Sequence, residues 1–423
     1  MQFRTTVRDS IRRGRLGVCA VAACALVACI AANCGARTGL TVPDADGARD
    51  VVHPPVACDW PPIGPGEAVT ALDESTSVQD IVAAEDAVWV TFRGNRDGAI
   101  TPVSTVRVGV LGARLSAPVS LAGLTTLVRD GAVFLGARAT HRGLAAQSLS
   151  GCTLVPLDAR GASSAALVPI VAAPCVSIDA TDLGFDAITL DAAGRAGVMT
   201  LTRMSPSGAT RSRSDLTLDR VAGPFVRFAR NADGSFLLVS STMDRLQVRQ
   251  FAQDGTPLTV GGSPGVTPLL PSRVTGSDIA MTATPDGPVL AWQPSPTSGD
   301  ASPAIVVVAL DRAGSLRAPP TVLTGSPRPI ASARSAPSVT YASGDVLVTW
   351  FTDGRPGRAR LLLQPLLLDG TPRRATIDLG EYDAAGSPHI VATSSGVVIV
   401  FDARPRDNDP RAQVHALGLT CFR

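Results

Sequence analysis

A short apolar pattern recurs along most of this chain, and this repeat restricts the possible folds more than any other feature. Seven runs of four to six residues begin 45 to 57 residues apart, at 87–92, 132–136, 187–190, 235–239, 288–292, 345–350 and 397–401. The runs follow turn signals such as Asp233-Gly234 and Asp286-Gly287. Because each run is short and bounded by turns, it predicts a buried strand rather than a helix.

A second strand, of alternating pattern, follows these runs and leads into a glycine-containing turn. Examples are 199–204 before Ser207-Gly208, 246–251 before Asp254-Gly255, 305–310 before Asp311 to Gly314, and 361–368 before Asp369-Gly370. Such residue pairs accept the positive backbone torsions that tight hairpins require. No stretch of a dozen residues has the 3.6-residue period of a helix. We therefore expect an all-β chain built from antiparallel hairpins.

Several antiparallel strands in every fifty or so residues, repeated about seven times over 66–423, resemble a β-propeller. The seventh repeat ends early, after 413–417, and 67–72 could supply its outermost strand. We predict an all-β propeller of seven blades, closed by N- and C-terminal strands. Six or eight blades, or a pair of β-sandwiches, are the alternatives. The chain lacks the Trp-Asp dipeptides of WD40 repeats and the double-glycine signature of kelch repeats, so it matches no named propeller family.

The first forty residues have the order of an export signal. Five arginines and one aspartate precede an uncharged run from Leu16 to Ala36. Within this run, Leu26-Val27-Ala28-Cys29 resembles the lipobox of bacterial lipoproteins, where the chain is cut before an acylated cysteine. The resemblance implies a signal peptide at 1–28 and a lipid on Cys29, with Cys34 as the alternative acceptor. A plain secretory signal and an uncleaved transmembrane anchor are the other interpretations.

Residues 29–65 are rich in proline and aspartate, which suits a tether between a lipid anchor and the folded body at 66–423. Four cysteines follow the leader, and an even number in an oxidising compartment predicts disulfides. Of the three possible connectivities, the local one pairs Cys152 with Cys175, and Cys58 with Cys421 would then join the two ends of the body. None of the four lies within twenty residues of another, so a zinc site is not expected.

The charge balance argues against a nucleic-acid partner. All 38 basic residues are arginine and the formal net charge is +2, so the body without its leader is close to neutral. Nucleic-acid binding needs an excess of cations. Aromatic residues make up only 4% of the chain, which weighs against stacking platforms for carbohydrate or single strands. Trp89, Trp292 and Trp350 lie in the repeated strands, where packing between blades explains them, and Trp60 is expected to cover the ring closure.

No set of catalytic residues stands out in the sequence. A nucleophilic site would need a sharply positioned Ser or Cys and a His base, and no Gly-x-Ser-x-Gly motif is present. Ser387 lies close to His389, but this spacing fits the start of a strand equally well. The other histidines are His53, His141 and His415, and the tyrosines are Tyr341 and Tyr382. We expect these histidines to be satisfied in the core or exposed.

Two acidic segments are candidates for calcium binding, and a third segment is a candidate for a sialidase motif. Asp179 to Asp182 and Asp407-Asn408-Asp409 offer oxygen ligands but lack the spacing of an EF-hand, so solvated turns explain them better. Residues 285–292 only loosely resemble the Asp-box of sialidases. Paired carboxylates for sugar hydrolysis could come from any two loops. We therefore predict no catalytic residue, no metal and no cofactor.

Together these features predict an envelope-anchored lipoprotein that acts as a non-catalytic binding module through the loops of one propeller face. Its partners would be the membrane, through the N-terminal lipid, and a protein or other surface partner, with the chain itself monomeric. The location would be the bacterial cell envelope, at the outer membrane or the periplasmic face, with secretion as the alternative. The rival hypothesis is a secreted, glycan-active hydrolase or lyase whose carboxylates, His or Arg side chains converge in the propeller funnel.

Overall fold

The structure is a computed structural model of the 423-residue chain. It describes residues 58–62, 67–69, 75–84, 87–95, 103–121, 124, 133–138, 140–148, 151–164, 166–191, 198–218, 226–231, 233–241, 246–260, 263–264, 267–268, 279–293, 305–323, 329–330, 333–334, 336–353, 358–384, 386–404 and 411–421. These residues form strands, turns and irregular segments, and none of them is helical. Within these ranges, therefore, no helix is long and apolar enough to cross a membrane.

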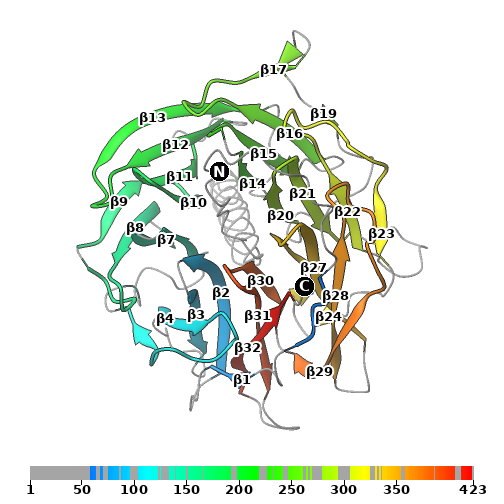
Figure 1. Cartoon of the computed structure of the whole chain (residues 1–423). Helices are drawn as coiled ribbons and strands as arrows, with labels where there is room; N and C mark the ends of the chain where they lie inside the picture. The colour runs from blue at the N-terminus through cyan, green and yellow to red at the C-terminus, as the bar shows by residue number, and fades with distance from the viewer. Residues whose placement is uncertain are drawn as a thin grey trace, which may run out of the picture.

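Five four-stranded antiparallel sheets stand separately around a common axis, as the blades of a propeller (Figure 1). In chain order they are β2 (Ser75–Ala84), β3 (Ala87–Asn95), β4 (Val103–Gly109) and β5 (Val119–Ser120); β6 (Val133–Ala137), β7 (Arg142–Ser148), β8 (Gly151–Leu157) and β9 (Val168–Val171); β10 (Cys175–Thr181), β11 (Gly184–Leu190), β12 (Val198–Met204) and β13 (Thr210–Thr217); β14 (Val226–Arg230), β15 (Phe236–Ser241), β16 (Leu246–Phe251) and β19 (Thr267–Pro268); and β20 (Ala280–Thr284), β21 (Gly287–Trp292), β22 (Ile305–Ala309) and β23 (Thr321–Leu323). Two short pairs accompany them, β17 (Thr259–Val260) with β18 (Ser263–Pro264) and β24 (Pro329–Ile330) with β25 (Ala333–Arg334).

The remaining strands form one eight-stranded sheet, so the prediction of seven separate blades is wrong: five are separate. Its strands are β26 (Ser338–Ala342), β27 (Asp345–Asp353), β28 (Ala359–Leu366), β29 (Ile377–Ala384), β30 (His389–Ala392), β31 (Gly396–Arg404), β32 (Gln413–Thr420) and β1 (Glu67–Ala68). The cause is β29, whose last two residues, Asp383 and Ala384, pair with β31. An ion pair of 3.1 Å between Asp383 Oδ1 and Arg404 Nη1 supports this junction.

The ring is closed by strands from both ends of the chain, as predicted. β1 pairs with β32 in antiparallel register, Glu67 opposite Ala416 and Ala68 opposite His415. The innermost strands contact one another in succession from β2 through β6, β10, β14, β20, β26 and β30 and back to β2 (Figure 1). The first and the last strand of the chain therefore lie side by side.

Hydrophobic clusters fill the spaces between neighbouring sheets. Trp89 lies between the first and second sheets, Trp292 between the fourth and fifth, and Trp350 between the fifth sheet and the eight-stranded sheet. Because a sheet in such a ring is covered on both faces, its central strands are apolar throughout rather than alternating; β21, for example, is buried along its whole length. Because of this two-sided burial, the repeats can be recognised in the sequence as unbroken apolar runs.

One of these runs lies at a different position within its blade from the other six. Six of the seven runs form the second strand of their repeat, but 133–137 is β6, the innermost strand of the second sheet. The second strand there is β7, Arg142–Ser148, whose Arg, Gly and Gln residues hide it from a search for apolar runs.

Short turns gather at one end of the ring, which we call the turn end. In each separate blade the first-to-second and third-to-fourth connections emerge at this same end, because the strands alternate in direction. The third-to-fourth turns close through hydrogen bonds from a glycine N–H to the carbonyl three residues earlier, as from Gly161 to Asp158 at 3.1 Å and from Gly314 to Asp311 at 3.0 Å. These glycines have φ of +86° and +89°, which confirms the predicted turn chemistry.

Candidate functional site

Four charged side chains converge at the turn end between the third and fourth sheets. Asp179 on β10 and Asp186 on β11 face each other across the strand pair, and Arg203 on β12 lies opposite Asp186. Arg230, the last residue of β14, reaches across from the fourth sheet, with its Nε 3.3 Å from Asp179 Oδ2 and its Nη2 bonded to Asp186 Oδ2. Arg203 Nε lies 3.8 Å from Asp186 Oδ1. We call these residues the carboxylate–arginine cluster.

Burial raises the pKa of Asp186, and the negative charge of Asp179 adds to this effect, while Arg230 and Arg203 oppose it. A carboxyl group with a raised pKa is a trait of general acids. Here, however, Arg230 bridges both carboxylates and also donates to the Gly234 carbonyl at 3.2 Å. The contacts therefore link the third sheet to the fourth. In them, the charges of the two arginines neutralise those of the two aspartates.

The acidic segment at 179–182, a candidate for calcium, does not form a cation site. Asp179 is held by Arg230, whereas the side chain of Asp182 is 82% exposed and 3.9 Å from Arg138 Nε. Within the described ranges, no three His, Cys, Asp or Glu side chains are grouped as a metal site would require. Residues 407–409 lie outside the described residues.

Two histidines have packing roles. His141 Nε2 is 2.8 Å from the Gly184 carbonyl oxygen and its Nδ1 is 2.9 Å from Thr140 Oγ1, while the ring meets Phe185 edge-on. His415 stacks on Phe401 with ring centroids 5.7 Å apart. These contacts explain both rings without a catalytic task, and His53 lies outside the described residues.

His389 and Asp402 are buried on the same face of the eight-stranded sheet, toward the first blade. His389 lies opposite Val400 in the β30–β31 register, and Asp402 is two residues farther along β31. Both oxygens of Asp402 accept the Val78 N–H, at 2.9 and 3.1 Å. Burial raises the pKa of Asp402 to about 7 despite this hydrogen bond, and burial lowers the pKa of His389 to about 4.

These residues do not form a Ser–His–Asp relay with Ser387. Such a relay needs the carboxylate to accept a hydrogen bond from the imidazole. His389 Nδ1 has no hydrogen-bond partner among the described residues, and the Ser387 hydroxyl accepts the Ala336 N–H at 2.9 Å. Asp402 instead connects the last sheet to β2. Tyr341 and Tyr382 lie on β26 and β29, and the Tyr382 hydroxyl donates to the Leu379 carbonyl at 3.2 Å.

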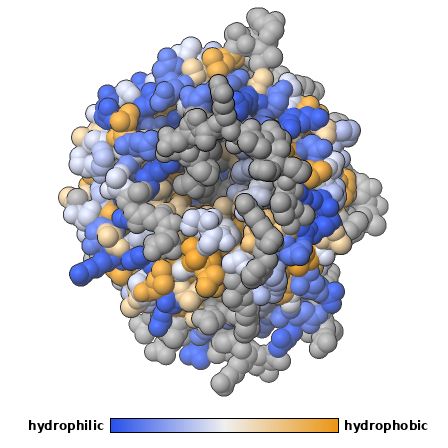
Figure 2. Space-filling view, viewed as in Figure 1, coloured by the Kyte–Doolittle hydropathy of each residue, from blue (hydrophilic) through white to orange (hydrophobic). Residues whose placement is uncertain are grey.

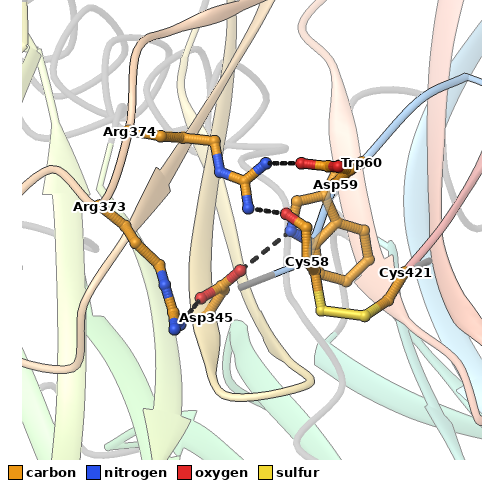
Figure 3. Close-up of a disulfide and its surroundings, with 7 residues drawn as sticks. All are labelled: Cys58, Asp59, Trp60, Asp345, Arg373, Arg374 and Cys421. Carbon is orange, nitrogen blue, oxygen red and sulfur yellow. Dashed lines mark hydrogen bonds and ion pairs between the residues drawn. A yellow bond between two sulfur atoms is a disulfide. The ribbon is translucent and has the colours of Figure 1, made fainter. Parts of the chain in front are cut away.

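Both predicted disulfides are present, Cys152–Cys175 and Cys58–Cys421. Figure 3 shows the second one with its surroundings. Trp60 is buried beside it, and its indole Nε1 donates to Asp345 Oδ2 at 3.0 Å (Figure 3). Trp60 therefore covers the ring closure, as expected. Cys58 and Trp60, which belong to the segment predicted to be a tether, pack in the core of the folded body, and Pro62 forms a β-bridge with Leu419.

Two arginines of the β28–β29 connection complete the closure. Arg373 forms an ion pair with the fully buried Asp345, and Arg374 bonds to the Cys58 carbonyl and to Asp59 Oδ1, the latter at 2.7 Å (Figure 3). Their role had no sequence signal, because arginine is the sole basic residue type of the chain and Asp345 was recognised only as the first residue of the run 345–350. Only the fold brings residue 345 to residue 60.

The segment of Cys58 and Trp60 occupies the place that a third-to-fourth turn takes at the other junctions between neighbouring sheets. The glycine of each third-to-fourth turn lies against the preceding sheet: Gly161 meets Trp89, Gly208 meets Val168, Gly255 meets Ser214, Gly314 meets Val248, Gly370 meets Ala309, and Gly112 meets Gly418. β32 has no such turn, because its outer partner β1 comes from the other end of the chain. Cys58 and Trp60 instead pack on Leu347 and Leu361 of the preceding strands. The disulfide thus gives β32 a covalent substitute for the missing turn.

The lipidation candidates Cys29 and Cys34 lie outside the described residues.

On the face of the molecule shown in Figure 2, small hydrophobic areas (orange) are scattered among hydrophilic ones (blue) around the ring.

The comparisons with known proteins show no family for this chain. No protein-family model matches the sequence, and no curated protein matches it. Among solved structures, the chain is similar to the β-propeller domain of Cps50 (Swd1) from Myceliophteria thermophila, with 11% identity, 84% of this chain and 100% of that chain covered, and a TM-score of 0.45. It is also similar to the β-propeller domain of the Trilobed protease from Pyrococcus furiosus, with 8% identity, coverage of 82% and 94%, and a TM-score of 0.45.

A third similar structure comes from a study of two prolyl endopeptidases, with 13% identity and a TM-score of 0.43. The match covers 83% of this chain but only 51% of that one, so the chain spans about half of that protein's length. At such identities the likeness concerns the arrangement of strands alone.

Proposed function

We propose that this protein is exported, anchored to the cell envelope through a lipid on Cys29, and serves as a non-catalytic binding module for a protein or other surface partner. The observation that carries the proposal is the closure of the ring at the point where the chain joins it. Cys58 is disulfide-bonded to Cys421, and Trp60 is buried beside the bond. We expect a body clamped at this point to retain its fold when the chain that precedes Cys58 is pulled.

The disulfides also support export. All four body cysteines are paired in two bonds, Cys58–Cys421 and Cys152–Cys175. Disulfides persist in oxidising compartments and are rare in the bacterial cytosol. Together with the lipobox-like leader, they favour the periplasmic or outer face of the envelope.

Intact-mass analysis of the envelope-extracted protein tests the anchor. We expect an acylated N-terminal Cys29, loss of palmitate labelling in Cys29→Ala, and retained labelling in the matched variant Cys34→Ala. Labelling lost only in Cys34→Ala would move the anchor to Cys34. A free amine at any other position would contradict the lipoprotein proposal.

The alternative is a glycan-active hydrolase or lyase, and the raised pKa of Asp186 beside Asp179 is the observation in its favour. Its test is turnover of a panel of chromogenic glycosides by the wild type, Asp186→Asn and Asp182→Asn. Asp182 is the matched control, since it is an exposed aspartate of the same blade. We expect no turnover by any of the three. Activity abolished in Asp186→Asn but kept in Asp182→Asn would establish the enzyme instead.

A further inference from the structure

We propose that the turn end of the ring faces the membrane, and that exposed leucines on its turns enter the headgroup region of the bilayer. This inference rests on the proposed lipid anchor and goes beyond it, because it assigns a contact surface to the folded body. Its occupant is a lipid surface.

Exposed large hydrophobic side chains are concentrated at this end. Of the six found among the described residues, Leu111, Leu115, Leu183, Leu316 and Leu367 lie in or next to turns of the turn end, and only Val322 lies on an outer strand. Their exposed fractions run from 38% to 62%. Single exposed leucines are ordinary, but turn tips are usually polar. Five leucines on turns at one end of the ring would allow that end to meet an apolar phase.

The anchor chain joins the body at the same end. Cys58 and Asp59 contact Arg374 in the β28–β29 connection, and Trp60 contacts Asp345 at the start of β27. Both contacts belong to the turn end. A chain that carries a lipid on Cys29 would therefore enter the body at the turn end.

Most of the leucines flank this junction. Leu316 and Leu367 lie on the turns of the two preceding repeats, and Leu111 and Leu115 lie on the turn of the first blade, which packs against β32. About 30 residues separate Cys29 from Cys58, and a chain of that length reaches up to about 100 Å when extended. Attachment alone therefore leaves the body free to rotate, and the leucines would select this end.

The charges of the same region are close to balanced. Arg114 and Arg312 are exposed, and Arg317 pairs with Asp286 at 2.9 Å. The carboxylates of Asp311 and Asp369 accept backbone N–H groups of their own turns. A balanced surface has little net attraction for anionic lipid. The contact should therefore depend on the leucines and be insensitive to salt.

Depth-dependent quenching tests the proposal on the full lipidated protein in vesicles of phosphatidylethanolamine and phosphatidylglycerol. Leu115→Cys and Leu367→Cys carry an environment-sensitive fluorophore, and Ala172→Cys carries the same label as the control. Ala172 is exposed in the β9–β10 connection, at the end of the ring opposite the turns. Whichever of Cys29 and Cys34 is not acylated is replaced by alanine, so that only the introduced thiol reacts.

We expect lipids with a nitroxide near the headgroup to quench the labels at 115 and 367 several-fold more than the label at 172, with little change at high salt. Leu111→Asp should reduce quenching at 367 while the protein still floats with the vesicles. Equal quenching at 115 and 172 in floating protein would overturn the proposal and leave the anchor intact. A blue-shifted, unquenched label at 115 would assign the surface to a second copy or a protein partner. Protein that does not float would refute the anchor and this surface together.

Discussion

Removing the closure disulfide should destabilise the body more than removing the local one. The perturbation is the pair of double variants Cys58→Ser/Cys421→Ser and Cys152→Ser/Cys175→Ser, neither of which leaves a free thiol in the body. The first bond spans a sequence separation of 363 residues and the second spans 23. Cross-linking removes conformational entropy from the unfolded chain in proportion to the logarithm of the loop length. The chain-entropy relation gives about 6 kcal/mol for the long loop and about 3.5 kcal/mol for the short one.

The closure bond has a second reason to matter more. It holds β32 where other repeats have a turn, so its loss also frees the segment that contains Trp60. The local bond joins β8 to β10, two strands that are already paired within their own blades. The difference of about 2.5 kcal/mol from the loop lengths is therefore expected to be a lower bound for the contrast.

Urea unfolding followed by tryptophan fluorescence measures this contrast. With a slope of about 3 kcal/mol per molar, the midpoint should fall by about 2 M in the closure variant and by about 1 M in the local variant. An equal or larger shift in the local variant would refute the reasoning, because it would show that the ring closes well without its covalent link. Unfolding in two steps in the closure variant alone would indicate that the last sheet opens first.

Three further predictions concern the closure, the turns and the buried seam. Trp60→Phe removes the N–H that a buried carboxylate accepts and should lower the free energy of unfolding by about 1.5–3 kcal/mol, measured in urea; an unchanged midpoint would contradict it. Gly161→Ala should lower the melting temperature more than Gly370→Ala, although both glycines have φ near +85°. The added Cβ at 161 would clash with Thr105 Oγ1 and lie 2.8 Å from the Trp89 ring, whereas the one at 370 would lie 3.6 Å from Ala309 Cβ; equal losses would show that backbone strain alone decides. The raised pKa of Asp402, about 7, makes its contribution to stability fall as pH rises from 4 to 7, whereas the lowered pKa of His389, about 4, makes its contribution fall as pH drops from 6.5 to 4. Relative to wild type, Asp402→Asn should therefore gain stability as pH rises and His389→Gln should gain it as pH falls, measured by urea unfolding at pH 4 to 8; parallel curves would contradict the assignment.

Sequence reasoning found the strands that appear as unbroken apolar runs and the alternating strands that precede a glycine turn, but it missed β7. The runs at 288–292 and 397–401 coincide with β21 and β31, because burial against two neighbours leaves no polar residue to interrupt them. β7 was missed because its Arg, Gly and Gln residues break the apolar pattern. The number of separate blades was wrong for a different reason: two residues at the end of β29 join the last repeats into one sheet.

The residues of the candidate site could likewise be predicted only in part. The cysteine pairs could be predicted, since four cysteines allow few connectivities and the ends of a ring must meet. The carboxylate–arginine cluster could not, because Arg230 lies 51 residues from Asp179 and 44 residues from Asp186, the two carboxylates that it bridges. Nothing in the local pattern distinguishes this arginine from the others in the chain.

The amino-acid sequence by itself determined that the chain is all-β, repeats about every fifty residues, and closes with strands from its two ends, since period, turn residues and burial pattern are local properties. Only the tertiary structure decided which charges neutralise one another, how many sheets stand apart, and that Asp345 receives the indole N–H of Trp60. Those outcomes depend on the register between sheets. That register is set by side-chain packing across the whole ring, and no window of sequence contains it.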